Sequence, residues 1–259
     1  ERSHDPYLHA THGLVADPDE QMPRILSRPT GQASEAGDGP RLWHLVATVL
    51  LPFAVGYYLS YLYRTINALI SGTLVNEFGL SAADLGVLTA VLFPTFGALQ
   101  LPLGVWLDRF GPRRVQAVLL AVAAIGAAVF ASAHDLLGLI LGRALIGLGV
   151  AGALMAGLKA LVLWFPTERI ALANGWLITL GALGAVTATA PAEMLIASIG
   201  WRGLFLLLAI LSASAALLIL QFVPERPTRG RGETTASGMT IRAVYRDAQF
   251  WRIAPLSAT

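Results

Sequence analysis

Cysteine is absent from this chain, and charged residues make up only 13% of it. Without cysteine there is no disulfide, no thiolate metal site and no cysteine nucleophile. A soluble domain of this length needs more charges to cover its surface, yet 55% of the residues are hydrophobic and the mean hydropathy is +0.63. The formal net charge of +2 is too small to indicate nucleic-acid binding. These shortages favour a protein whose main partner is the lipid bilayer.

Residues 1–41 are polar, rich in proline, glycine and aspartate, and lack any apolar period. We expect a disordered cytoplasmic tail there, without the apolar core of a signal peptide. His4, His9 and His12 lie close together in this tail. Nothing in a solvated tail fixes ligand geometry, so the sequence predicts no metal site and no cofactor.

Six long apolar intervals follow the tail: five are uncharged runs between charged residues, at 42–63, 85–107, 115–134, 170–192 and 203–224, and the sixth, 136–163, contains Arg143 and Lys159. About 20 apolar residues cross the hydrocarbon core of a bilayer as a helix. Continuous runs of this length predict helices, because barrel strands alternate in segments of about ten residues. The predicted membrane spans are 44–74, 82–107, 114–133, 136–163, 169–193 and 202–223.

Arginines are concentrated in alternate loops of this pattern. They gather after the second span and after the sixth, whereas the opposite loops carry Glu77, Asp84 and Asp135. Cytoplasmic loops of membrane proteins carry the excess of basic residues. The bias predicts a multi-pass protein of the cell membrane, with both ends of this chain in the cytoplasm.

The most specific motif joins the second and third predicted spans, and it reads Gly104-Val-Trp-Leu-Asp108-Arg109-Phe-Gly111-Pro-Arg113-Arg114. Its glycines permit a tight turn, and its aspartate can accept hydrogen bonds from the positive end of a neighbouring helix. The segment closely resembles the G-x-x-x-D-R-x-G-R-R loop of the major facilitator superfamily, which latches the inner gate in that family. The resemblance implies gating roles for Gly104, Asp108, Arg109, Gly111, Arg113 and Arg114.

Further segments resemble the same family over residues 42–259. Tyr61-Leu-Tyr-Arg64-Thr-Ile-Asn67 is similar to its first-helix element F-x-D-R-x-N, with Tyr63 where many members have aspartate. The stretch from Arg143 to Gly149 is similar to its fourth-helix element R-x-x-x-G-x-G. The fold that this resemblance implies is all-α, with six transmembrane helices at 42–224 arranged as two inverted three-helix repeats. A cytoplasmic linker at 225–250 and the start of a seventh helix at 251–259 would follow, so we expect the C-terminal six-helix half to be missing from this chain.

Two arginines lie inside predicted spans. An arginine at the bilayer centre costs at least ~2.5–3.5 kcal/mol, so it should face a wet cavity or a partner. The repeat places Arg64 and Arg143 in equivalent helices, ~15 Å and ~12 Å inside their outer ends at ~1.5 Å per residue. For Arg143 a structural hydrogen bond to a carbonyl remains the alternative. The candidate substrate-binding residues are Arg64, Asn67 and Arg143, whereas Lys159 and Glu193 fall near span ends, where snorkelling is the default.

These features predict a secondary transporter that moves a small solute by alternating access, and the cationic spans favour a small organic anion as substrate. A proton is the candidate coupling ion, although Tyr63 leaves its binding site open. Two alternatives remain: a drug or metabolite efflux transporter of the same superfamily, and a non-transporting scaffold or sensor. An enzyme is not expected, because the spans contain no G-x-S motif and no paired carboxylates.

Overall fold

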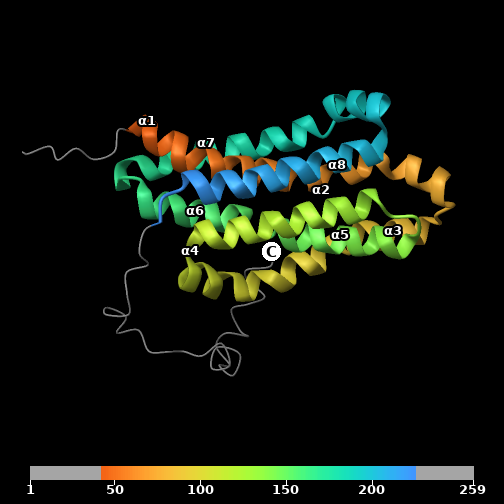
Figure 1. Cartoon of the computed structure of the whole chain (residues 1–259), viewed down its shortest axis with the longest axis horizontal. Coiled ribbons are helices and arrows are strands. Elements are labelled where there is room, and N and C mark those ends of the chain that lie inside the picture. Colours follow the sequence, from red (N-terminus) through yellow and green to blue (C-terminus); the bar gives the residue numbers. More distant parts are fainter. Residues whose placement is uncertain (1–41, 226–259) are drawn as a thin grey trace, which may run out of the picture. The chain divides into compact units, whose positions relative to one another are not determined.

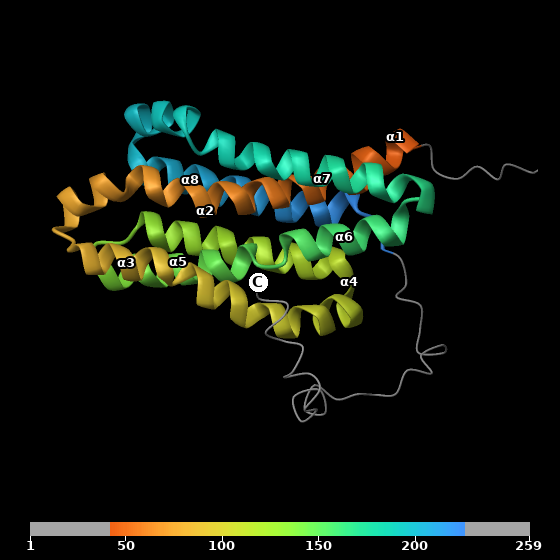
Figure 2. The same ribbon diagram turned by 180° about the vertical axis from the view of Figure 1, so that it is seen from behind.

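The computed structural model describes residues 42–225, and every regular element in that range is helical (Figure 1). The expected tail at 1–41 and the expected seventh helix at 251–259 lie outside the described residues, as does all but the first residue of the expected linker. Six of the described helices are long and apolar enough to cross a membrane, judged by length and composition. Figures 1 and 2 show them lying lengthwise beside one another.

The first span is a continuous helix made of α1 (Leu42–Leu45), the π-helical turn η1 (Val46–Leu50) and α2 (Leu51–Phe78). It runs over 37 residues, which is longer than the bilayer requires and longer than the predicted 44–74. It ends at Gly79, whose positive φ of 62° is the usual backbone conformation after a helix end.

A glycine turn separates the second span from the third. Ser81 caps α3 (Ala82–Ala90) in a capping box with Asp84, and α4 (Leu92–Ala131) follows. Inside α4, Gly111 has a φ of 78° and a ψ of 160°, a conformation open to glycine because it lacks a Cβ. The part of α4 before Gly111 therefore completes the second span, and the part after it forms the third.

A second glycine turn of this kind occurs in the second half of the bundle. The fourth span comprises α5 (Leu136–Val150) and α6 (Ala153–Trp164), and α7 (Thr167–Thr187) begins the fifth. Within α8 (Ala190–Phe222), Gly200 has a φ of 72° and a ψ of 168° and so divides the fifth span from the sixth. Corresponding glycine turns after the second and fifth spans are what two copies of a three-helix unit predict.

Glycines bring neighbouring spans into close contact. A Cβ on Gly149 would lie 2.4 Å from the backbone nitrogen of Ala123, which shows how closely α5 approaches the third span. A Cβ on Gly184 would lie 2.1 Å from the carbonyl oxygen of Tyr58, so α7 is equally close to α2. Glycines allow this approach because no side chain keeps the two helix backbones apart.

Two ends of the bundle are used below as reference points. The Gly111 end contains the Gly111 turn, α1 and the end of α6, whereas the Gly200 end contains the Gly200 turn, α3 and the start of α5 (Figure 2). The core between them is apolar, with tightly packed aromatic rings such as Phe130 and Phe205, whose centroids are 4.4 Å apart.

Candidate functional site

Arg64 is half-buried on α2, and aromatic rings surround its guanidinium group. Its Cζ atom lies 4.4 Å from the ring centroid of Phe96 on α4 and 5.6 Å from that of Tyr61 on α2. Its Nε atom is buried and has no hydrogen-bond partner, and no carboxylate in the described range lies within 4.0 Å. The charge is therefore balanced within the described bundle only by the faces of aromatic rings.

Tyr57 extends this aromatic group by one helical turn. Its ring meets that of Tyr61 edge-to-face at 5.0 Å, and its hydroxyl donates a long hydrogen bond of 3.4 Å to the Tyr61 hydroxyl. A Cβ on Gly181 would lie 2.2 Å from Cδ1 of Tyr57, so α7 holds this ring closely. The three side chains lie on one helix face because residues 57, 61 and 64 are four and three positions apart. This spacing could have predicted from the sequence that the two tyrosines lie beside Arg64. Phe96 comes from another span and has no such local signal.

Asn67 lies one turn beyond Arg64 and connects α2 to α3. It is 4% exposed, and its Nδ2 donates a hydrogen bond of 2.9 Å to Oγ1 of Thr89. Its Oδ1 is buried without a partner among the described residues. The Asn67 side chain therefore ties α2 to α3, and its oxygen is left as an unused acceptor.

Arg143 lies on the other side of the α2 backbone. It is 1% exposed, and its Nη1 donates a hydrogen bond of 2.9 Å to the carbonyl oxygen of Tyr63. Of the two roles considered for Arg143, the hydrogen bond to a carbonyl is present in the structure. The contact also places the two arginines at the same depth, although only Arg64 reaches the bundle surface.

Tyr63, which occupies the position of the family's aspartate, points away from Arg64. Its side chain is fully buried, and its hydroxyl lies 3.0 Å from Oγ of Ser212 on α8. The first-helix motif therefore divides its side chains between the core and the surface, because consecutive helical residues point about 100° apart.

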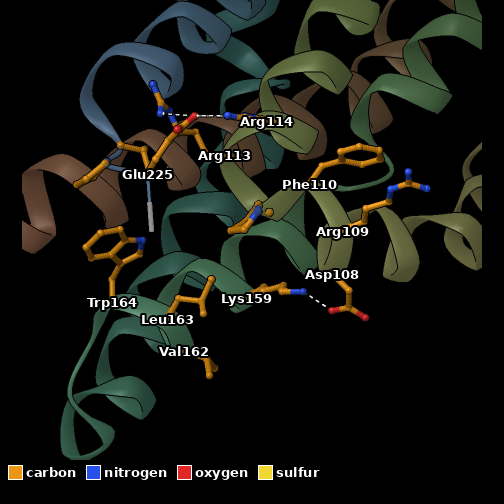
Figure 3. A pocket seen from close by; sticks show the side chains of 14 residues that line it. Asp108, Arg109, Phe110, Arg113, Arg114, Lys159, Val162, Leu163, Trp164 and Glu225 are labelled. Atoms are coloured by element: carbon orange, nitrogen blue, oxygen red, sulfur yellow. Dashed lines mark hydrogen bonds and ion pairs between the residues drawn. The ribbon is translucent and has the colours of Figure 1, made fainter. Parts of the chain in front are cut away.

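A cleft lies at the Gly111 end, and Arg64 is not among its lining residues (Figure 3). It has a volume of about 1090 Å³, and it is lined by the Gly111 turn and by the ends of the fourth and sixth spans. A smaller cleft of about 360 Å³ continues from it between α4 and α6, past Gly104. Both clefts contain Asp108 and Lys159, so this pair stands between them.

Asp108 forms an ion pair with Lys159, as Figure 3 shows. The Asp108 side chain is 81% exposed and that of Lys159 is 27% exposed. Snorkelling was expected for Lys159 because it lies near a span end, and its ammonium group contacts the exposed carboxylate of Asp108 there. The pair joins the end of the second span to the fourth.

The arginines after Gly111 hold the end of the sixth span. Arg113 and Arg114 contact Oε1 of Glu225 at 3.0 Å and 2.9 Å, and Arg113 also donates to the carbonyl of Leu220. The hydrogen bond from Arg114 and the two positive charges lower the pKa of Glu225 below its usual value. Arg109 is exposed, lies over the ring of Phe110 at 5.3 Å and has no ion pair in the described range.

A second polar contact closes the Gly200 end. Glu77 accepts a hydrogen bond of 2.7 Å from Nε1 of Trp201 and also pairs with Arg202. Arg202 donates in addition to the carbonyl oxygen of Ala133 at 2.9 Å. The first, third and sixth spans are thereby joined at this end, and of these residues the sequence analysis named only Glu77, as an acidic residue of a loop.

Comparison with known proteins agrees with the motifs. The family model described as Major Facilitator Superfamily matches residues 53–259. The chain is similar to the probable sulfoacetate transporter SauU of Cupriavidus necator, at 27% identity over 175 residues, covering 67% of this chain and 40% of that protein. It is also similar to the hexuronate transporter of Escherichia coli K12, at 27% identity over 229 residues, covering 82% of this chain and 52% of that protein.

The fold is shared with a solved structure. It is a bacterial homologue of the human lysosomal transporter Spinster, with a TM-score of 0.66 and 21% sequence identity, covering 85% of this chain and 53% of that one. The chain thus spans about half the length, or less, of the relatives that it matches.

Proposed function

The chain belongs to the major facilitator superfamily, and from this premise we propose that it forms one helical bundle of a secondary transporter for a small organic anion. The superfamily and the named relatives are transporters and not enzymes. Alternating access requires one bundle to rock against another around a shared site. A chain that spans 40–52% of these relatives matches one such bundle.

The uncompensated charge of Arg64 is the observation that supports an anionic substrate. Fourteen residues separate it from the end of α2 at Phe78, or ~21 Å at ~1.5 Å per residue, so it lies near mid-membrane. A buried cation without a counter-ion is costly, and an anion that arrives to pair with it removes that cost. Arg143 adds a second positive charge beside α2.

Among anions, the chemistry of arginine favours an oxyanion as the substrate. A guanidinium presents a planar fork of donors that fits a carboxylate bidentately, whereas a lysine offers only a point charge. The names of the two relatives specify sulfoacetate and hexuronate, which both carry carboxylates. We therefore propose a small organic carboxylate or sulfonate as the transported solute.

The Gly111 end is the proposed cytoplasmic gate. Its cleft gathers Arg109, Arg113 and Arg114 together with the Asp108–Lys159 pair. With this orientation, both ends of the chain would lie in the cytoplasm, and the protein would lie in the plasma membrane.

A proton is the proposed coupling ion. Its binding group would lie away from Arg64, because no described carboxylate is within 4.0 Å of that guanidinium.

Uptake into liposomes containing the intact protein tests this function. Labelled sulfoacetate and galacturonate are compared with neutral galactose and cationic lysine, with and without an inward proton gradient. We expect saturable uptake of an anion and none of galactose or lysine. Uptake that the proton gradient leaves unchanged would remove the proton from the proposal.

Arg64→Lys supplies the residue-level test. It keeps the charge but removes the fork, so affinity for the anion should fall at least about tenfold, or ~1.4 kcal/mol, at normal expression. Arg169→Lys, at an exposed arginine in the first turn of α7, is the matched control and should change nothing. Transport of a neutral or cationic solute with unchanged affinity in Arg64→Lys would overturn the proposed function.

A further inference from the structure

We propose that Phe96, Tyr61 and Tyr57 act as an aromatic clamp that fixes the plane of the Arg64 guanidinium and adds a phenol donor beside it. These residues would then determine how tightly the site binds an oxyanion. The inference rests on the proposed function, since it concerns the same arginine. It assigns Phe96 as a positioning residue and Tyr61 as a direct contact to substrate.

The ring of Phe96 restricts the orientation of Arg64. With Cζ 4.4 Å from the ring centroid, the guanidinium lies against the face of Phe96, and the Tyr61 ring lies 5.6 Å away. An arginine on an aromatic face keeps its N–H groups directed outward at its edges, where they remain free to donate. The clamp therefore lowers the conformational freedom of a long side chain before substrate arrives, which is how preorganisation increases affinity.

The two tyrosines form a donor chain that ends beside the arginine. Tyr57 donates to the oxygen of Tyr61, so the hydroxyl hydrogen of Tyr61 is free for another acceptor. Tyr57 is only 5% exposed and packs against Gly181, which limits the directions its own hydroxyl can take. An incoming oxyanion can thus accept from the edge of Arg64 and from Tyr61 together.

The arrangement also disfavours cationic substrates. Aromatic faces attract ammonium groups, but the face of Phe96 is already occupied by a guanidinium. A substrate cation would therefore meet a fixed positive charge and no free ring face on Phe96. The site selects solutes with at least two oxygens in a carboxylate or sulfonate group.

A purely structural role for Phe96 is the competing explanation, because its half-buried ring also packs against the hydrophobic core. The two explanations differ in how Phe96 depends on Arg64. If the ring orients the guanidinium fork, removing it lowers anion affinity only while residue 64 is arginine. If the ring only packs against the core, removing it lowers affinity by the same factor whatever residue stands at position 64.

The test uses the intact protein with sulfoacetate and galacturonate as probes, measuring equilibrium affinity in detergent and KM and kcat in liposomes. Phe96→Leu should weaken affinity about three- to tenfold and raise KM at unchanged kcat. Phe96→Tyr keeps a ring face and should restore affinity. Phe93→Leu, at an exposed phenylalanine one turn earlier, is the matched control and should leave affinity unchanged.

Tyr61→Phe tests the phenol donor. It should weaken affinity by a similar factor, because it removes the donor but keeps the ring.

The deciding measurement is a double-mutant cycle between positions 96 and 64. In an Arg64→Lys background, Phe96→Leu should cause less than about a twofold further loss. An equal loss in both backgrounds, or a Phe96→Leu protein that behaves like Phe93→Leu, would overturn the clamp while leaving an Arg64-dependent anion transporter intact. If the wild-type protein binds neither probe and transports neutral solutes, the proposed function fails and the clamp fails with it.

Discussion

The guanidinium of Arg143 donates a hydrogen bond from Nη1 to the main-chain carbonyl oxygen of Tyr63, at 2.9 Å. This contact joins the fourth span to the first at the residue directly before Arg64. Arg143 thus helps to hold the backbone that carries the half-buried Arg64. The charge of Arg143 itself has no carboxylate within 4.0 Å in the described residues. One arginine faces the surface and the other supports it from behind, so replacing each should have a different effect.

Replacing Arg143 by glutamine tests its contribution. Arg143→Gln removes the charge and keeps a polar side chain, whose Nε2 stands where the unpartnered Nε of the arginine stands. We expect a folded protein that binds the anion several-fold more weakly, because the positive potential around Arg64 falls in a low-dielectric interior. The measurements are anion affinity and thermal unfolding of the purified protein. Unchanged affinity together with a lower unfolding temperature would limit Arg143 to a structural role.

Asp108 is expected to act in the gate and not in substrate binding. It lies in the cleft at the Gly111 end, away from Arg64, and its 81% exposed side chain contributes little to stability. Asp108→Asn should slow turnover, leave equilibrium anion affinity within a few-fold and change the unfolding temperature little. A large loss of affinity with normal turnover would contradict this assignment.

Exchanging the two charges tests the partner of Asp108. Asp108→Lys and Lys159→Asp should each slow turnover, because each places two like charges side by side. The double variant recreates the pair in reverse and should recover part of the rate. If the double variant is slower than both single variants, the contact between Asp108 and Lys159 does not contribute to gating.

Helix positions followed from the sequence because the bilayer imposes a simple rule on length and polarity. The six predicted spans match the helices, and the family motif located the Gly111 turn. The ends differ more: the first span was predicted to stop at residue 74 but continues to Phe78, where the positive φ of Gly79 ends the helix. The fifth span continues past 193 to the turn at Gly200, with a break at Ala188 and Thr189 before Pro191.

Side-chain partners could not be predicted in the same way, because they depend on how distant spans rotate against each other. Arg64 and Arg143 looked alike in sequence, yet one is half-buried against Phe96 and the other is 1% exposed. Lys159 finds Asp108 from 51 positions away, and Arg114 finds Glu225 from 111 positions away. A local sequence pattern cannot predict contacts between residues so far apart in the chain. Helical periodicity, in contrast, could have predicted that residues 57, 61 and 64 share one face of their helix.

Membrane orientation remains a prediction, and single cysteines can test it on a background that contains none. Ala83 is exposed at the Gly200 end, and Glu168 is exposed at the Gly111 end. Substituting Ala83 spares the Ser81 cap of α3. An impermeant thiol reagent added outside cells should label Ala83→Cys and not Glu168→Cys. Labelling of Glu168→Cys alone would reverse the assigned topology.

Close helix packing predicts unequal effects for two glycine-to-alanine changes. A Cβ at position 149 would lie 2.4 Å from backbone of the third span, which cannot move aside as a flexible side chain could. Gly149→Ala should therefore destabilise the bundle by about 1–3 kcal/mol, as overpacking does. Gly175 has nothing within 4 Å of its Cβ position, so Gly175→Ala should be neutral or stabilising by up to about 1 kcal/mol. Thermal unfolding of both variants in detergent is the check, and equal effects would contradict the packing explanation.

The contact at the Gly200 end predicts that an indole matters more for stability than an arginine. Trp201 is 5% exposed and donates to Glu77, and hydrogen bonds to charged groups contribute about 1.5–3 kcal/mol. Arg202 and Glu77 have side chains that are 38% and 35% exposed, so their ion pair is screened by solvent and contributes less than about 1 kcal/mol. Trp201→Phe should therefore lower the unfolding temperature more than Arg202→Gln. High salt should reduce only the effect of Arg202→Gln, because screening weakens exposed ion pairs and leaves a buried hydrogen bond largely intact. Unfolding curves of both variants at low and high salt provide the test. If Arg202→Gln lowers the unfolding temperature more than Trp201→Phe, or if salt changes both variants equally, then the ion pair and not the indole holds the first span to the sixth.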